Sequence, residues 1–219
     1  MLRVAFQTAV SAPEAAFEIQ YGHVRRATQD NTKGEYAQFE VVGHRWADLS
    51  RRDAGIALLN DSKYGYRVKG RSLELTLLRA ATEPDPVADR GAHLFVYSLL
   101  PHAGDLAASD VHAQAATINQ GVEVLAGLAA PPAMALPVAV SGAGIELAVL
   151  KRAEKGDDLV VRLVETLGLH ARGELVCTDA GARIVPTDLM EWKDEPAAGT
   201  GRTALAFTPF EIKTFRIRP

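Results

Sequence analysis

The stretch LLNDSKYGY at residues 58–66 places an amide, a carboxylate, an ammonium group and a phenol within five positions, at Asn60, Asp61, Lys63 and Tyr64. Together these groups offer several hydrogen-bond donors and acceptors, which suits a hydroxyl-rich ligand. The same residues also suit a turn, because Asn and Asp side chains accept hydrogen bonds from nearby backbone amides and the glycine that follows adopts a positive φ at low cost. The pattern predicts a polar hairpin turn between two strands and leaves a ligand-binding role open.

Other polar residues are scattered along the chain. His44, Trp46 and Asp48 alternate onto one face of a predicted strand, and His102 and Asp105 lie in a predicted loop. In both places a hydrogen-bonded structural histidine is the simplest interpretation. The carboxylates of EPDPVAD, at Glu83, Asp85 and Asp89, lie in a proline-bearing loop and are expected to be solvated. A glycosidase acid/base pair would need two carboxylates at a defined separation across a bound sugar.

Several kinds of chemistry lack their sequence motifs. No histidine is followed two residues later by Asp or Glu, and no P-loop, GxGxxG or GxSxG motif occurs. Cys177 is the single cysteine, which rules out a thiolate zinc site and predicts a buried structural thiol in a reducing compartment. The net charge of −3, with no separate Lys/Arg cluster, argues against nucleic-acid binding. No signal peptide or membrane span is evident, so a cytoplasmic protein is expected.

Strand patterns dominate the 219 residues. Residues 72–79, SLELTLLR, alternate between apolar and polar, and residues 93–101, HLFVYSLLP, are apolar on both faces, which predicts a strand inside a sandwich. Residues 145–168 read as two strands joined by a KGDD turn, and residues 203–219 supply two more strands around Pro209. Only residues 109–120 begin like a helix, with Ser109 as the candidate N-cap. The chain is therefore predicted to be all-β, with a larger sandwich portion at 1–132 and a small immunoglobulin-like sandwich at 133–219.

A long ordered set of residues resembles the C-terminal region of glycoside hydrolase family 38, the α-mannosidases, most closely the cytosolic type. The resemblance rests on DLS at 48–50, GIALLNDSKYG at 55–65, LLR at 77–79, PDPVAD at 84–89 and HLFVYSLLPHAG at 93–104. It extends upstream to FEIQYGHVRRAT and FEVVGHRWADLS, and downstream to LVVRLVE and FTPFEIKTFRI. One departure lies at Arg26–Glu35, where the His and Trp of the family pattern are missing and its Asp is replaced by Glu.

The resemblance implies a multidomain retaining α-mannosidase that hydrolyses terminal α-mannosides. Its N-terminal catalytic domain would carry a divalent metal, usually zinc, with a carboxylate nucleophile and an acid/base. None of these is expected within the present residues, so no catalytic residue, metal ligand or cofactor is assigned here. The larger sandwich portion would be galactose-mutarotase-like, and a homo-oligomer is possible.

The resemblance also implies that the C-terminal sandwich packs on the catalytic domain and supplies polar side chains to the edge of the sugar site. The candidates for this substrate edge are Asn60, Asp61, Lys63, Tyr64 and Arg79. If the strand at 72–79 pairs with the chain leading into the NDSKYG turn, Arg79 is expected near Ile56 rather than at the tip of the turn.

Two other functions remain open. A stand-alone carbohydrate-binding module would need an aromatic platform on its surface, for which Trp192 is the candidate, although aromatic residues make up only 6% of the chain. A complete small enzyme, such as a sugar mutarotase, would need a His and a Glu facing one concave sheet, and analogy of fold alone does not supply them.

Overall fold

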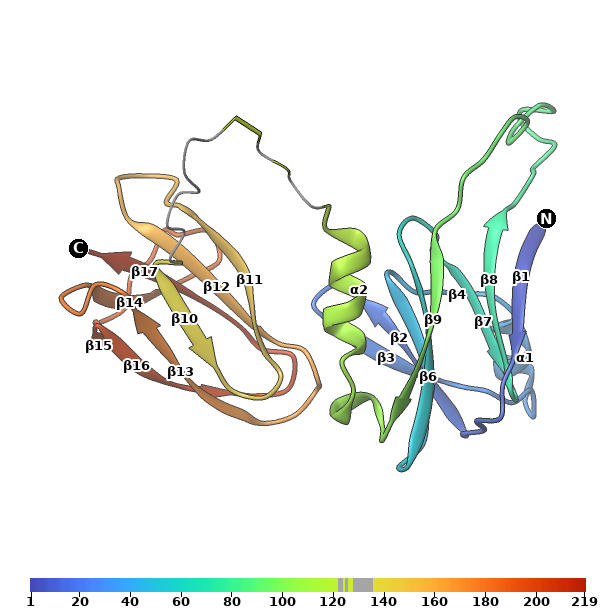
Figure 1. Cartoon of the computed structure of the whole chain (residues 1–219), viewed down its shortest axis with the longest axis horizontal. Coiled ribbons are helices and arrows are strands. Elements are labelled where there is room, and N and C mark those ends of the chain that lie inside the picture. Colours follow the sequence, from blue (N-terminus) through green and yellow to red (C-terminus); the bar gives the residue numbers. More distant parts are fainter. Residues whose placement is uncertain (122–123, 125, 128–135) are drawn as a thin grey trace. The chain divides into compact units, whose positions relative to one another are not determined.

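The structure, a computed structural model, describes residues 1–121, 124, 126–127 and 136–219. It contains two compact units, Met1–Val124 (unit 1) and Leu125–Pro219 (unit 2). The domain boundary predicted between residues 132 and 133 lies outside the described residues. Both units consist almost entirely of antiparallel strands (Figure 1), so the prediction of an all-β chain is confirmed.

Unit 1 is a sandwich of two sheets. The four-stranded sheet has the order β1 (Leu2–Gln7), β8 (Ser72–Leu78), β7 (Gly65–Lys69), β4 (Val41–Val42). The five-stranded sheet has the order β3 (Gly22–Ala27), β2 (Glu14–Ile19), β5 (Trp46–Ser50), β6 (Ala54–Asn60), β9 (Tyr97–Ala103).

The core of unit 1 forms where the apolar faces of the two sheets meet. Leu73, Leu75 and Leu77 of β8 pack there with Tyr66 and Leu58, as the alternation of residues 72–79 predicts. The polar face of β8 is buried as well. Arg3 and Arg67 donate hydrogen bonds to the two carboxylate oxygens of Glu74, at 3.0 Å and 2.6 Å, so this acidic side chain is paired although it is only 8% exposed.

The prediction that residues 93–101 form an interior strand is wrong. The strand is β9, Tyr97–Ala103, and it forms one edge of the five-stranded sheet. Tyr97 and Leu99 are each more than one third exposed, and Leu94 before the strand is almost fully exposed. An apolar composition does not distinguish a strand that neighbours surround from an edge strand whose side chains lie at an open side.

The interpretation of NDSKYG as a hairpin turn is also wrong. β6, which precedes it, pairs with β5 and β9, whereas β7, which follows it, pairs with β8 and β4. The segment therefore crosses from one sheet of the sandwich to the other. Leu58 on β6 and Val68 on β7 both point into the core, and they reach it from facing sheets.

Two helices accompany the sheets of unit 1. The helix α2 (Val111–Asn119) covers the outer face of the five-stranded sheet, where Val111 and Ala115 pack with Trp46. Its N-cap is Asp110 rather than the predicted Ser109, whose hydroxyl instead donates to the carbonyl of Leu106 in the 3₁₀ helix Leu106–Ala108.

The short helix α1 (Lys33–Ala37) begins in the segment that departs from the family pattern. Its first turn is a capping box: Thr32 accepts a hydrogen bond from the backbone amide of Glu35, and the Glu35 carboxylate accepts one from the amide of Thr32. The glutamate found in place of the family's aspartate therefore has a local structural role in this chain.

Unit 2 is a smaller sandwich. Its three-stranded sheet has the order β10 (Val138–Ser141), β13 (Ala171–Cys177), β16 (Arg202–Phe207). Its five-stranded sheet has the order β11 (Ile145–Arg152), β12 (Leu159–Glu165), β17 (Ile212–Arg218), β14 (Arg183–Thr187), β15 (Gly199–Thr200). The pairing of β11 with β12 is the hairpin predicted at residues 145–168, and Cys177 is a buried free thiol, as its apolar surroundings indicate. None of the helices in the described ranges is long and apolar enough to cross a membrane.

Candidate functional site

Asn60 holds the crossover NDSKYG in shape. Its side chain is buried, its carbonyl oxygen accepts hydrogen bonds from the amides of Ser62 and Lys63, and its amide nitrogen donates to the carbonyl of His44 and to the Tyr66 hydroxyl. Burial raises the pKa of Tyr66 well above its usual range, which keeps the phenol protonated. With both ends of its amide engaged, Asn60 positions its neighbours from within the fold.

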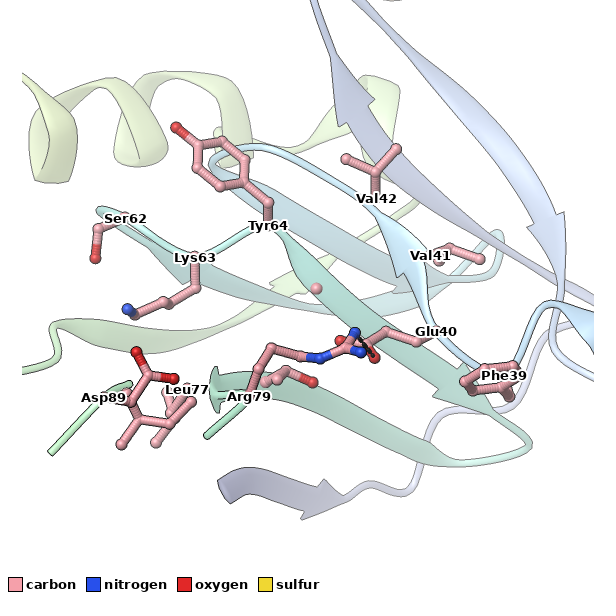
Figure 2. Close-up of a pocket in the computed structure, with 13 residues that line it drawn as sticks. Phe39, Glu40, Val41, Val42, Ser62, Lys63, Tyr64, Leu77, Arg79 and Asp89 are labelled. Carbon is pink, nitrogen blue, oxygen red and sulfur yellow. Dashed lines mark ion pairs between the residues drawn. The ribbon is translucent and has the colours of Figure 1, made fainter. Parts of the chain in front are cut away.

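Beside the crossover lies an open pocket of about 600 Å³, which we call the crossover pocket (Figure 2). Three segments of unit 1 and the single residue Asp89 supply its walls. The residues that line it are Phe39, Glu40, Val41, Val42, Ser62, Lys63, Tyr64, Gly65, Thr76, Leu77, Leu78, Arg79 and Asp89. Among the five residues predicted at a substrate edge, Lys63, Tyr64 and Arg79 line this pocket, whereas Asn60 and Asp61 lie beside it.

Strand pairing brings these distant segments together. β7 pairs with β8 so that Gly65 faces Thr76, and the chain that leaves β8 at Arg79 therefore runs beside Ser62 in the crossover. The expectation that Arg79 lies near Ile56 is wrong, because Ile56 belongs to β6 in the other sheet. Arg79 lies at the crossover itself.

Glu40 anchors the charges of the pocket. Its carboxylate oxygen Oε2 lies 3.5 Å from Arg79 Nη1 and 3.7 Å from Arg3 Nη2, and its side chain is only 12% exposed. Figure 2 shows the Arg79 guanidinium reaching toward this carboxylate. Gly65 makes the arrangement possible, since a Cβ at that position would lie 2.3 Å from Glu40 Oε1. Most of the Arg79 side chain, 71%, remains exposed, so its other donors are accessible.

Lys63 and Tyr64 present a cation and an exposed ring at the crossover. The Lys63 ammonium lies 4.9 Å from the centre of the Phe95 ring, a cation–π contact that limits where the chain can swing. Tyr64 packs edge-on against His44 and is 60% exposed. Asp61 is exposed, and its carboxylate accepts a hydrogen bond from the Ser62 hydroxyl. Lys63 and Tyr64 therefore line the crossover pocket together with Arg79 and Glu40, whereas Asp61 is not among its lining residues.

A second polar cluster joins candidates that the sequence presents separately. Asp48 Oδ1 lies 2.9 Å from His102 Nε2, and the Ser50 hydroxyl donates to Asp48 Oδ2 at 2.5 Å. Both side chains of the Asp48–His102 pair are almost fully buried. Since the serine is bonded to the aspartate and not to the histidine, this is not the arrangement of a nucleophilic triad. The pair joins β5 to β9, as expected for a structural histidine.

The remaining sequence candidates have local roles. Asp105 caps the 3₁₀ helix by accepting a hydrogen bond from the amide of Ala108. Asp85 and Asp89 accept hydrogen bonds from the amides of Val87 and Ala80, and both residues are exposed, as predicted for this loop. The described residues hold no group of three or more His, Cys, Asp or Glu side chains placed to bind a metal ion.

The sequence did not point to Glu40, Phe39 or Val42 as neighbours of the crossover. They join the pocket because the short strand β4 pairs with the start of β7, Val41 facing Tyr66 and Val42 facing Gly65. A two-residue strand leaves no periodic pattern, so only the adjacency of an acidic residue to a pair of valines could have drawn attention to it.

Comparison with protein families gives two matches. Residues 1–87 match the Glycosyl hydrolases family 38 C-terminal domain, and residues 144–215 match the Glycosyl hydrolases family 38 C-terminal beta sandwich domain. The crossover and most of the pocket lie within the first match.

Curated relatives match along nearly the whole chain. Human Alpha-mannosidase 2C1 is 38% identical over 218 residues, which is 96% of this chain and 21% of the relative. Alpha-mannosidase G of Dictyostelium discoideum is 37% identical over 224 residues, 99% of this chain and 21% of the relative. The chain therefore spans about a fifth of the length of these relatives.

Solved structures share the fold. An alpha-mannosidase from Enterococcus faecalis V583 superposes with a TM-score of 0.76 at 21% identity, over 98% of this chain and 25% of that one. A second Enterococcus faecalis protein in the glycosyl hydrolase family 38 gives a TM-score of 0.74 at 20% identity. With both family matches and the curated relatives in agreement, the chain belongs to glycoside hydrolase family 38, and it carries the C-terminal domains of that family.

Proposed function

We propose that this chain is the C-terminal β-sandwich region of a retaining α-mannosidase that hydrolyses terminal α-mannosides in the cytoplasm. In this proposal it scaffolds the enzyme and forms one edge of an active site whose catalytic groups lie in a separate domain. The observation that carries the proposal is the 37–38% identity to Alpha-mannosidase 2C1 across nearly all of the chain.

The crossover pocket is the part of the chain that we assign to the substrate edge. Mannosides offer hydroxyl groups that both donate and accept hydrogen bonds, and a pocket with mixed charges can bind several of them in fixed directions. Arg79 supplies exposed guanidinium donors, and Glu40 holds that guanidinium in place by an ion pair. A half-open hollow that a second domain could close would exclude water from these contacts.

The other candidates differ in how directly we propose that they contact the sugar. Lys63 and Tyr64 line the pocket and are proposed to contact the sugar directly, whereas Asn60 acts by fixing the backbone that carries them. Asp61 is proposed as an outer contact, since its carboxylate lies beside the pocket and bonds only locally. These residues bind and orient; proton transfer and nucleophilic attack are assigned to the catalytic domain, as is the divalent metal that the family implies.

Activity assays on two proteins test the proposal. A longer protein, produced with the coding sequence upstream of Met1, should hydrolyse an aryl α-mannoside and leave an aryl β-mannoside and an aryl α-glucoside intact. The 219-residue chain alone should hydrolyse none of the three. An α-mannosidase activity retained by the short chain, or a longer protein with no α-mannosidase activity, would each refute the proposal.

A second candidate function is a stand-alone carbohydrate-binding module. The observation that favours it is Trp192, which is 72% exposed between Met190 and Lys193 on a loop that backbone hydrogen bonds hold in shape. Trp46, the other tryptophan, is fully buried, so fluorescence quenching by a soluble quencher or a sugar reports on Trp192. A module of this kind requires saturable quenching by mannan oligosaccharides, together with binding in isothermal titration calorimetry that Trp192→Ala abolishes. No change in fluorescence would eliminate it.

A further inference from the structure

The ladder between β5 and β6 ends at Asn60, where the crossover begins. Arg45 lies opposite Asn60 in the register of these strands, because Trp46 faces Leu59. The amide of Asn60 donates to the carbonyl of Arg45 at 2.8 Å, as expected for an antiparallel pair. The Arg45 amide, however, donates to the Glu18 carboxylate at 2.7 Å. The Asn60 carbonyl, which would accept from that amide in a regular ladder, accepts a hydrogen bond from outside the sheet.

The donor is Asn119, the last residue of α2. Its side-chain nitrogen Nδ2 lies 3.0 Å from the carbonyl oxygen of Asn60 and 2.9 Å from that of Ala115, one turn back in the helix. A side-chain amide carries two N–H donors, so each carbonyl receives one and the orientation of the amide is fixed. Asn60 is only 1% exposed, so its carbonyl is shielded from water and depends on this donor.

The spacing of residues in α2 directs Asn119 toward the sheet. Val111 and Ala115 pack on the outer face of the five-stranded sheet, in the cluster that contains Trp46. Residues four apart lie on one face of a helix, so Asn119 follows Val111 and Ala115 on the face that contacts the sheet. The packing of α2 therefore determines where the Asn119 side chain meets Asn60.

Asn60 connects α2 to the crossover pocket. Its side-chain oxygen accepts hydrogen bonds from the amides of Ser62 and Lys63, and Lys63 and Tyr64 line the pocket. The backbone that carries these two side chains is therefore fixed relative to Asn60, and Asn119 fixes Asn60 in turn. None of the residues of α2 is among those that line the pocket. The helix thus contributes to the geometry of the pocket without contacting its contents.

We propose that Asn119 is a positioning residue of the crossover pocket. By holding the Asn60 carbonyl, the end of α2 sets where Lys63 and Tyr64 present their side chains. The consequence for a bound mannoside rests on the proposed function, whereas the placement of the two side chains does not. Asn119 acts through the backbone of Asn60, so its loss should change how well the pocket binds and leave the chemical step to the catalytic domain.

Hydrogen exchange in the 219-residue chain tests the placement without any activity. Asn119→Asp is nearly isosteric and replaces the two N–H donors by a carboxylate that faces two carbonyl oxygens. The amides of Ser62 and Lys63 should exchange about threefold to tenfold faster in this variant, because their acceptor on Asn60 is less firmly held. The amide of Leu75 in β8 should keep its protection, which separates a local change from global unfolding.

Two further variants and the unmodified chain keep this test decisive. Gln120→Glu introduces the same charge at the next position, which is exposed, and should leave the exchange of both crossover amides unchanged. Asn119→Ala removes the donors without adding charge and should act in the same direction as Asn119→Asp. In the unmodified chain, the side-chain amide hydrogens of Asn119 should exchange more slowly than those of Gln120. Equal exchange at Ser62 and Lys63 in Asn119→Asp and Gln120→Glu would overturn the proposal.

Steady-state kinetics of the longer protein test the consequence for the pocket. Displaced binding residues weaken the ground state and the transition state alike, so Asn119→Asp should raise KM for an aryl α-mannoside about threefold to tenfold with kcat nearly unchanged. A purely structural defect would instead lower kcat at unchanged KM, because less of the enzyme would be folded. In a Lys63→Ala, Tyr64→Ala background, Asn119→Asp should raise KM no further, since the residues through which it acts are gone.

The outcomes separate this proposal from the proposed function. An unchanged KM in Asn119→Asp, or the same increase in the Lys63→Ala, Tyr64→Ala background, would overturn the positioning role of Asn119. Unchanged kinetics in Arg79→Ala would instead contradict the substrate edge. A longer protein without α-mannosidase activity would refute the proposed function, and the exchange of the crossover amides would then decide whether Asn119 places Lys63 and Tyr64.

Discussion

Asp48 on β5 and His102 on β9 form a buried pair, with 2.9 Å between Oδ1 and Nε2, that spans the intervening strand β6. The pair passes over Gly55 of β6, where a Cβ would lie 2.2 Å from the histidine ring. The edge strand β9 is therefore held to the sheet by a side-chain contact as well as by its backbone ladder.

Removal of the histidine should be costly. His102→Ala leaves the Asp48 carboxylate buried with only the Ser50 hydroxyl as its partner, and breaking a buried pair in this way costs about 3 kcal/mol. Urea unfolding of the variant should show that loss with an unchanged dependence on denaturant. The exposed His93→Ala is a control that should change the free energy of unfolding little. Equal stabilities of the two variants would contradict a structural role for the pair.

The free energy of unfolding should depend on pH at acidic values because of the protonation of Asp48. Burial raises the pKa of this carboxyl above 3.8, although Ser50, His102 and Arg25 partly offset the effect. A raised pKa means that the folded state binds the proton more tightly. The contribution of Asp48 to stability is therefore full below pH 3.8 and is lost as the pH rises through the folded-state pKa.

Carboxyl-carbon NMR titration of Asp48, combined with unfolding at several pH values, checks this direction. The resonance should titrate above pH 3.8, and Asp48→Asn should remove the fall in the free energy of unfolding over the same interval. A midpoint below 3.8 would show that the hydrogen bonds outweigh burial.

Gly55 and Gly65 differ in how easily their neighbours can make room for an added Cβ, so alanine substitutions at the two positions can be compared. At Gly55 a new Cβ meets the His102 ring and lies 2.6 Å from the Ser50 Cβ, so Gly55→Ala should cost about 2–3 kcal/mol. At Gly65 the closest atom is the end of the flexible Glu40 side chain, so Gly65→Ala should cost about 1 kcal/mol or less. Thermal unfolding of both variants measures the difference, and the reverse order would contradict the packing described for Glu40 and His102.

Much of the fold follows from local pattern. Alternation identifies β8, the KGDD turn identifies the β11–β12 hairpin, and the apolar setting of Cys177 predicts its burial. These features depend on neighbours in sequence. The errors at residues 58–66 and 93–101 have a different origin, because the assignment of strands to sheets depends on contacts that are distant in sequence.

The candidate site likewise contains residues that the sequence could identify and residues that join it only through contacts distant in sequence. The residues Lys63, Tyr64 and Arg79 could be selected from the sequence, because their chemistry and the family resemblance both pointed to them. Glu40 could not, since it reaches the pocket through a two-residue strand whose partner lies far along the chain, Val41 pairing with Tyr66 in β7. The partnership of Asp48 with His102 was likewise hidden by a separation of 54 residues.

The crossover itself should be sensitive to the amide of Asn60. Asn60→Ala removes the acceptor for the Ser62 and Lys63 amides and leaves the buried Tyr66 hydroxyl with fewer partners, which should cost about 2 kcal/mol. Hydrogen exchange should become faster at the amides of Ser62 and Lys63. Protection equal to that of the unmodified chain would show that the turn does not depend on this side chain.

The most direct measurement of the central claim is the steady-state kinetics of Arg79→Ala in the longer protein that contains the catalytic domain. Loss of a polar contact to the substrate costs about 1–3 kcal/mol, so kcat/KM for an aryl α-mannoside should fall roughly tenfold to a hundredfold. Arg202→Ala, at an arginine that is equally exposed in unit 2, is the matched control and should leave kcat/KM unchanged. Since Arg79 is largely exposed, the variant should unfold at the same temperature as the unmodified enzyme. A folded Arg79→Ala enzyme with unchanged kinetics would contradict the assignment of the crossover pocket to the substrate edge.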